Sequence, residues 1–93
     1  MRIVFDEHFI TNLTAILTFY DERNGDSNYS KKLCKMIFKS IQRLTVFPQI
    51  GRQTNIPTIR LLIVDKKFIV EYRIQEEQDV ILISDFYSCY INQ

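Results

Sequence analysis

Hydrophobic and polar residues follow two different periods along this chain, and each period is typical of one kind of element. Residues 1–5 form a short apolar run rich in β-formers, which predicts a strand. Apolar residues then recur at steps of three and four, which predicts amphipathic helices over about 6–23 and about 27–47. Further along the chain the period changes to two. The strands predicted there cover 58–64, 68–74 and 80–86.

Turn-forming and polar residues set the ends of the two predicted helices. Asn24-Gly25 is a pair that commonly ends a helix, and Asp26 or Ser27 is suited to cap the next one. Pro48 then ends the second helix. Because only a short link joins the two helices, we expect them to form an antiparallel hairpin.

The predicted elements run in the order β-α-α-β-β-β and indicate an α+β fold. We expect the helical hairpin to pack on one face of a small, mostly antiparallel sheet, in a single domain that spans residues 1–93. The other face of a sheet in a two-layer domain stays open. The residues that the alternation places on this open face are Arg60, Leu62, Val64, Ile69, Glu71 and Arg73. An apolar patch surrounded by charges is unusual on a solitary monomer and indicates a binding partner.

Composition narrows the class of protein without naming a function. Apolar residues make up 46% of the 93 residues, which is enough to form a core. No segment approaches the roughly 18 apolar residues of a membrane span, and the N-terminus lacks the apolar region of a signal peptide. We therefore expect a cytoplasmic protein without membrane contact. Two distant cysteines and one histidine do not match a zinc-binding spacing, so no metal and no cofactor is predicted.

Charge is distributed unevenly along the chain, although the net charge is only +1. Residues 31–73 hold ten basic residues and two acidic ones, whereas the segments on both sides are acidic overall. Four of the basic residues step along one side of the second predicted helix, namely Lys32, Lys35, Lys39 and Arg43. This basic centre is suited to a polyanion or an acidic partner, and ordinary solvation of exposed faces remains an equal alternative.

Four segments of the chain together resemble the RelE/ParE superfamily of type II toxin–antitoxin toxins, also known as plasmid stabilisation proteins. MRIVFDEHFITNL is similar to the opening strand and first helix of that group, and LTVFPQIGRQT contains its FPxIG connection. IRLLIVDKKFIVEYRI resembles the strand that begins with arginine and the hairpin that follows it, and DVILISDFYS resembles the last strand. No single motif is specific, but the order and spacing of all four cover nearly the whole chain.

The resemblance implies a small toxin that inhibits growth and is held inactive by a cognate acidic antitoxin. Members of the ParE type inhibit DNA gyrase and cut no bond, whereas members of the RelE type cleave mRNA on the ribosome. A degenerate toxin that only binds its antitoxin is a third reading. The resemblance leaves the oligomeric state open between a homodimer and a heterotetramer with the antitoxin.

The residues at the family's site positions favour the binding mechanism over RNA cleavage. Metal-free RNA cleavage needs a base, cations on the phosphate and an acid for the leaving oxygen. Cys89 stands about where relatives of the RelE type carry an arginine in their tail. We therefore predict a gyrase-type inhibitor, with a ribosome-dependent mRNA endoribonuclease as the alternative. The candidate catalytic residues for that alternative are Arg60, Arg73, Tyr87 and Tyr90.

Two further sets of residues are predicted to make contacts. Nucleic-acid contacts are predicted at Arg52 and Arg60. Antitoxin contacts are predicted at Lys35, Lys39, Arg60, Leu62, Val64, Ile69 and Arg73.

Overall fold

The computed structural model describes residues 1–89 and contains two helices packed on a five-stranded sheet. The elements are β1 (Arg2–Phe5), α1 (Glu7–Asn24), α2 (Asn28–Gln42), the short helix η1 (Arg43–Thr45), β2 (Arg52–Gln53), β3 (Ile59–Val64), β4 (Phe68–Gln75), the short helix η2 (Glu76–Gln78) and β5 (Val80–Ser88). The strand order is β1-β5-β4-β3-β2, and only the β1–β5 pair is parallel. The α+β prediction is confirmed. The two-residue strand β2 is an addition, because a segment that short has no period to detect.

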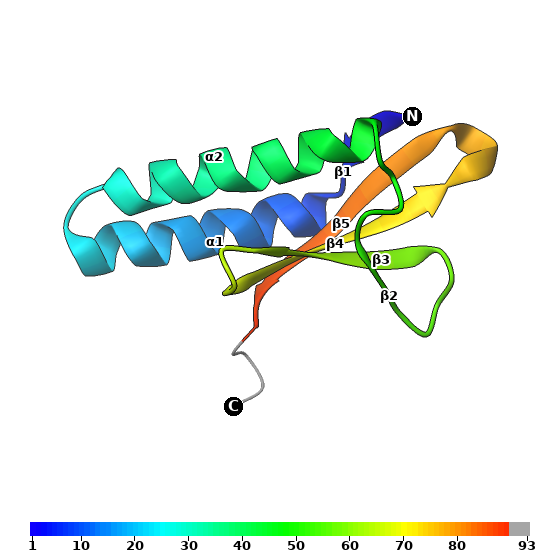
Figure 1. Cartoon of the computed structure of the whole chain (residues 1–93). Coiled ribbons are helices and arrows are strands. Elements are labelled where there is room, and N and C mark those ends of the chain that lie inside the picture. The colour runs from blue at the N-terminus through cyan, green and yellow to red at the C-terminus, as the bar shows by residue number, and fades with distance from the viewer. Residues whose placement is uncertain (90–93) are drawn as a thin grey trace.

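Both helices cover the same face of the sheet, as Figure 1 shows, and the core lies between these two layers. Aromatic rings form its centre. Phe68 stacks on Phe86 with ring centroids 5.5 Å apart, and Phe9 of α1 meets Phe86 edge-on at 6.0 Å. Offset and edge-on ring pairs of this kind add to the free energy of burial. The predicted helix periodicity is confirmed by the buried residues Phe9, Leu13, Leu33, Ile37 and Ile41.

The face of β3 that packs on the helices is the reverse of the one predicted. Leu62 pairs with Val70 and Val64 pairs with Phe68, and paired residues in adjacent strands carry their side chains on the same face. Because Val70 and Phe68 are buried under the helices, Leu62 and Val64 lie there as well. Their placement on the open face was wrong. Both faces of this strand are apolar, so a period of two cannot decide which face is buried.

Arg60 was also assigned to the wrong side of β3, because it pairs with the buried Tyr72. The placement of Ile69, Glu71 and Arg73 on the open face is confirmed by their pairing with Ile63, Leu61 and Ile59.

Two turns connect the elements by left-handed backbone conformations. Gly25 ends α1 with φ 73°, in agreement with the predicted helix end. The β3–β4 hairpin turns at Asp65 and Lys66, with φ values of 54° and 59°. Such a turn matches the twist of the strands that flank it. No helix within residues 1–89 is long and apolar enough to cross a membrane.

Candidate functional site

The open face of the sheet is the surface that the helices leave uncovered. It is formed by Ile59, Leu61 and Ile63 of β3, Ile69, Glu71 and Arg73 of β4, and Leu82, Asp85 and Tyr87 of β5. Its most apolar row runs across three strands, from Ile63 through Ile69 to Tyr87. Ile63 is 51% exposed, an unusual state for an isoleucine in the body of a strand. The face therefore offers apolar area to a partner.

A β-bulge places polar groups beside this apolar row. Glu71 pairs with Asp85 and the next residue, Tyr72, pairs with Ile83, so Ser84 is an extra residue in β5. The Ser84 hydroxyl donates to the Glu71 carboxylate at 2.8 Å. β1 ends at Phe5, which pairs with Ile83 of β5. Just beyond this pair, the Asp85 carboxylate accepts a hydrogen bond from the side-chain amide of Asn12 of α1 at 2.6 Å. The bulge thus fixes two carboxylates on the open face.

Tyr87, one of the candidate catalytic residues, lies next to these carboxylates. Burial raises the pKa of its phenol, and the negative charges of Glu71 and Asp85 raise it further. A tyrosine needs a neighbouring cation to act as a base near neutral pH, and its neighbours here are anions. The hydroxyl therefore remains protonated and is suited to hydrogen bonding or packing, not to proton abstraction.

Arg73 is the exposed cation of the open face. Its guanidinium has no carboxylate partner within 4 Å among residues 1–89. Arg73 borders a cavity of about 630 Å³ between the β2–β3 segment and η2, and a second cavity of about 400 Å³ beside the bulge. An exposed arginine without a carboxylate partner at such a position is available to an acidic group of a partner.

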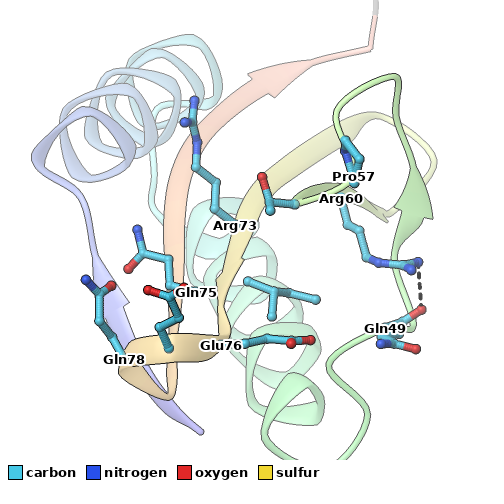
Figure 2. Close-up of a pocket in the computed structure, with 10 residues that line it drawn as sticks. Gln49, Pro57, Arg60, Arg73, Gln75, Glu76 and Gln78 are labelled. Carbon is cyan, nitrogen blue, oxygen red and sulfur yellow. Dashed lines mark hydrogen bonds between the residues drawn. The ribbon is translucent and has the colours of Figure 1, made fainter.

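Arg60 has a different role, because its guanidinium is held by the FPxIG loop. Its Nη1 donates to the Gln49 carbonyl at 3.1 Å and to the Gly51 carbonyl at 2.8 Å. Its Nε is buried and finds no acceptor among the described residues. In Figure 2 the side chains of Arg60 and Arg73 extend in different directions. They do not converge on a common phosphate position.

The Tyr72 hydroxyl completes the attachment of this loop. It donates to the Pro48 carbonyl at 2.7 Å and accepts from the Gly51 amide at 2.9 Å. Burial raises the pKa of the Tyr72 phenol, while the Gly51 hydrogen bond and the charge of Arg60 act in the opposite direction. One buried hydroxyl and one guanidinium therefore bind residues 48–51 to the sheet. The FPxIG motif is a structural connection in this chain.

Replacing Tyr72 with phenylalanine tests this attachment. The change leaves the Pro48 carbonyl and the buried Gly51 amide without their partner, so we expect the free energy of unfolding to fall by about 1–3 kcal/mol. Urea unfolding followed by circular dichroism measures the loss. Tyr20→Phe is the matched control, because the contacts of Tyr20 with Tyr29 and Phe68 are made by its ring, which phenylalanine keeps. An equal loss in both variants would show that the Tyr72 hydroxyl does not hold the loop.

The residues predicted to form one site are distributed over several surfaces. Arg52 pairs with Leu61 on the open face, whereas Arg60 lies on the other side of the neighbouring strand. Lys35 and Lys39 are on the exposed side of α2, which faces away from the sheet. Tyr90 lies outside the described residues. The structure brings together Arg52, Ile69, Arg73 and Tyr87 on the open face, and Arg60 and Arg73 line the same cavity of about 630 Å³.

Sequence reasoning missed two apolar surfaces. Ile59, Leu61 and Ile63 were left out of the open face because the two sides of β3 are equally apolar. Val46 and Phe47 were assigned to the second helix, but they follow η1 and are 69% and 61% exposed. In the sequence, the nearby Pro48 was the only indication that Val46 and Phe47 would be exposed.

Comparisons with known proteins identify the family to which this fold and face belong. The family model for the ParE toxin of the type II toxin-antitoxin system, parDE, matches residues 3–88. The chain belongs to the ParE toxin family. A solved structure of the chromosomal ParDE TA system from P. aeruginosa is similar with a TM-score of 0.78, over 95% of this chain and 95% of that chain. The two are 20% identical, so this likeness concerns the fold alone. No protein of curated function matches the chain.

Membership in the ParE family confirms the resemblance seen in the sequence. The protein is a toxin of a type II toxin–antitoxin system, and such a system includes a cognate antitoxin. The ParE assignment favours a binding mechanism over RNA cleavage. Two features of residues 1–89 agree with this: the side chains of Arg60 and Arg73 extend in different directions, and the charged neighbours that raise the pKa of Tyr87 include the carboxylates of Glu71 and Asp85.

Proposed function

We propose that this ParE-family toxin arrests growth by binding DNA gyrase in the cytoplasm, without breaking a bond itself. The observation that carries the proposal is the state of the candidate catalytic residues. Arg60 is fixed to two backbone carbonyls and the pKa of Tyr87 is raised. Among the described candidates, the loop engages Arg60 and Tyr87 is unsuited to act as a base, which leaves Arg73 as an exposed cation without the base that metal-free RNA cleavage also requires.

The open face is the surface we propose for the antitoxin. Its Ile63–Ile69–Tyr87 row provides apolar area, and the exposed Arg73 beside it can pair with an acidic side chain. Glu71 and Asp85, which the bulge holds in the middle of the face, favour a basic or hydrogen-donating group on the same partner. An amphipathic antitoxin segment with both signs of charge fits this arrangement better than a purely acidic one.

Induction of the toxin in cells without its antitoxin tests the proposed target. We expect a DNA-damage reporter to be switched on, while primer extension on abundant transcripts detects no new mRNA ends. The Tyr87→Phe variant should remain as toxic as the parent, because the proposed mechanism has no proton transfer. New mRNA ends without DNA damage would instead establish the ribosome-dependent endoribonuclease.

A further inference from the structure

The exposed side of the helical layer is basic and contains no acidic side chain over most of its length. Lys31, Lys32, Lys35, Lys39 and Arg43 are all exposed, and we refer to these five residues as the basic stripe. The chain contains no acidic residue between Asp26 and Asp65. The neighbouring helix α1 has no charged residue between Phe9 and Tyr20. Asp21 and Asp65 lie at the N-terminal end of α2, where they accept hydrogen bonds from Ser30 and Tyr29, so a polyanion meets no acidic side chain over the remainder of the stripe, from Lys35 to Arg43.

The basic stripe is unfavourable for the helix that carries it. Lys31, Lys35, Lys39 and Arg43 are each four residues apart, and like charges at this spacing destabilise a helix. The first turn of α2 contains no acidic residue, and the carboxylate that offsets the helix dipole is Asp26, which lies before the helix and accepts from the Asn28 amide at 3.0 Å. None of the five side chains has a carboxylate partner within residues 1–89. A surface that served only for solubility would interleave both signs of charge, so this one is better explained by a ligand.

The spacing of the stripe suits a phosphodiester backbone. Four residues of helix rise by about 6 Å, so Lys31 to Arg43 extend over about 18 Å. Over that length duplex DNA presents about ten phosphates, one per 1.7 Å of its axis. Flexible lysine side chains can each select a phosphate from such a row, because lysine acts as a point charge.

The same surface is poorly suited to an amphipathic acidic protein segment. A segment of that kind needs an apolar groove for its hydrophobic face. The exposed positions of α2 include one large apolar side chain, Phe38, which packs edge-on against Phe5. The apolar open face lies on the opposite layer of the molecule. Exposed apolar side chains lie beside the stripe at Ile10 and Phe19 of α1, but the stripe itself is a row of charges, which is the pattern of phosphate-dominated binding.

We propose that the basic stripe of α2 binds the phosphate backbone of duplex DNA, independently of sequence. The choice of DNA over RNA rests on the proposed gyrase target, because gyrase acts on DNA and a toxin bound to it would lie near the duplex. The stripe then adds an electrostatic contact to the gyrase–DNA complex, while the open face remains available to the antitoxin.

Fluorescence anisotropy with a labelled 20-base-pair duplex tests the proposal in the absence of gyrase. Four to five phosphate contacts predict a slope of about −4 for the logarithm of affinity against the logarithm of salt concentration. Between 50 and 200 mM salt that slope corresponds to a loss of about 250-fold in affinity. A slope shallower than about −2 would overturn the proposal. Tighter binding to a single-stranded RNA of the same length would overturn the assignment to DNA.

Two double variants locate the contact. Lys35→Gln with Lys39→Gln should weaken binding at least about tenfold at 50 mM salt and reduce the slope by about 2. Arg2→Gln with Lys66→Gln removes the same charge from exposed positions outside α2 and should leave affinity and slope unchanged. The Lys35/Lys39 variant should also melt no lower than the parent, since all three repulsive pairs at this spacing are gone. Equal weakening in the two double variants would overturn the assignment to α2.

The duplex-binding experiment and a gyrase-inhibition experiment test the two proposals separately. If the protein inhibits gyrase but does not bind duplex DNA, the proposed role of the basic stripe is wrong and the proposed gyrase target stands. Duplex binding without gyrase inhibition would overturn the target and leave the stripe as a DNA-binding surface.

Discussion

Replacing Gly51 with alanine is expected to lower the free energy of unfolding by about 3 kcal/mol. A Cβ atom at this position would lie 2.6 Å from the Tyr72 hydroxyl oxygen, 2.7 Å from Tyr72 Cε1 and 3.0 Å from the Leu61 carbonyl oxygen. Tyr72 is completely buried, so its ring has no space into which it can move. The clash would separate the loop from the sheet and break the hydroxyl's bonds to Pro48 and Gly51.

Gly25→Ala is the control for this experiment. Gly25 has φ 73°, and no atom lies within 4 Å of the position of an added Cβ. Alanine there carries only the backbone strain of the left-handed conformation, which costs about 1 kcal/mol. Guanidinium unfolding of both variants gives the comparison. A Gly51→Ala variant as stable as Gly25→Ala, or more stable, would contradict the close packing of the FPxIG loop on Tyr72.

The fold was largely predictable from the sequence because its elements differ clearly in period and have strong end signals. The α1 helix ends at Gly25 as expected, and the continuous apolar run of residues 80–86 fits the interior position of β5 in the sheet. The second helix was predicted about five residues too long. Val46 and Phe47 continue its apolar character, but they occupy an exposed loop that Pro48 and the Tyr72 hydroxyl hold in place.

The site was less predictable, because its residues are selected by tertiary packing. The pattern IRLLIV offers two apolar faces, and packing beneath α2 buries Leu62 and Val64 and exposes Ile63. Arg60 has the same sequence signal as a phosphate-binding arginine. Only the positions of the Gln49 and Gly51 carbonyls show that its guanidinium is already engaged. Sequence patterns identify residues that could bind a phosphate or take part in a reaction. Their hydrogen-bond partners in the structure decide whether the functional groups of these residues are free to do so.

Introducing a charge at Ile63 is expected to weaken binding of the cognate antitoxin about 100-fold, which corresponds to about 2.7 kcal/mol. Ile63 is the most exposed apolar residue of the open face, and Ile69 lies directly opposite it in β4. An aspartate there would remove apolar contact and place an unpaired carboxylate under the bound antitoxin. Isothermal titration calorimetry of the Ile63→Asp variant with the antitoxin measures the change.

Ile10→Asp is the matched control for the antitoxin experiment. Ile10 lies on α1 and is 46% exposed, close to the 51% of Ile63, but it is on the helical layer. Its replacement should change antitoxin affinity by less than about threefold, since surface substitutions outside an interface have small effects. Loss of affinity at Ile10 with retention at Ile63 would move the antitoxin to the helices and contradict the assignment of the open face.

The central claim is that this ParE-family toxin acts by binding gyrase, and a supercoiling assay with purified proteins tests it most directly. Relaxed plasmid, gyrase and ATP are incubated with increasing amounts of the toxin, with and without its cognate antitoxin. We predict that the toxin prevents supercoiling and that an equimolar amount of antitoxin restores it. Full supercoiling with the toxin in large excess over gyrase would contradict the account.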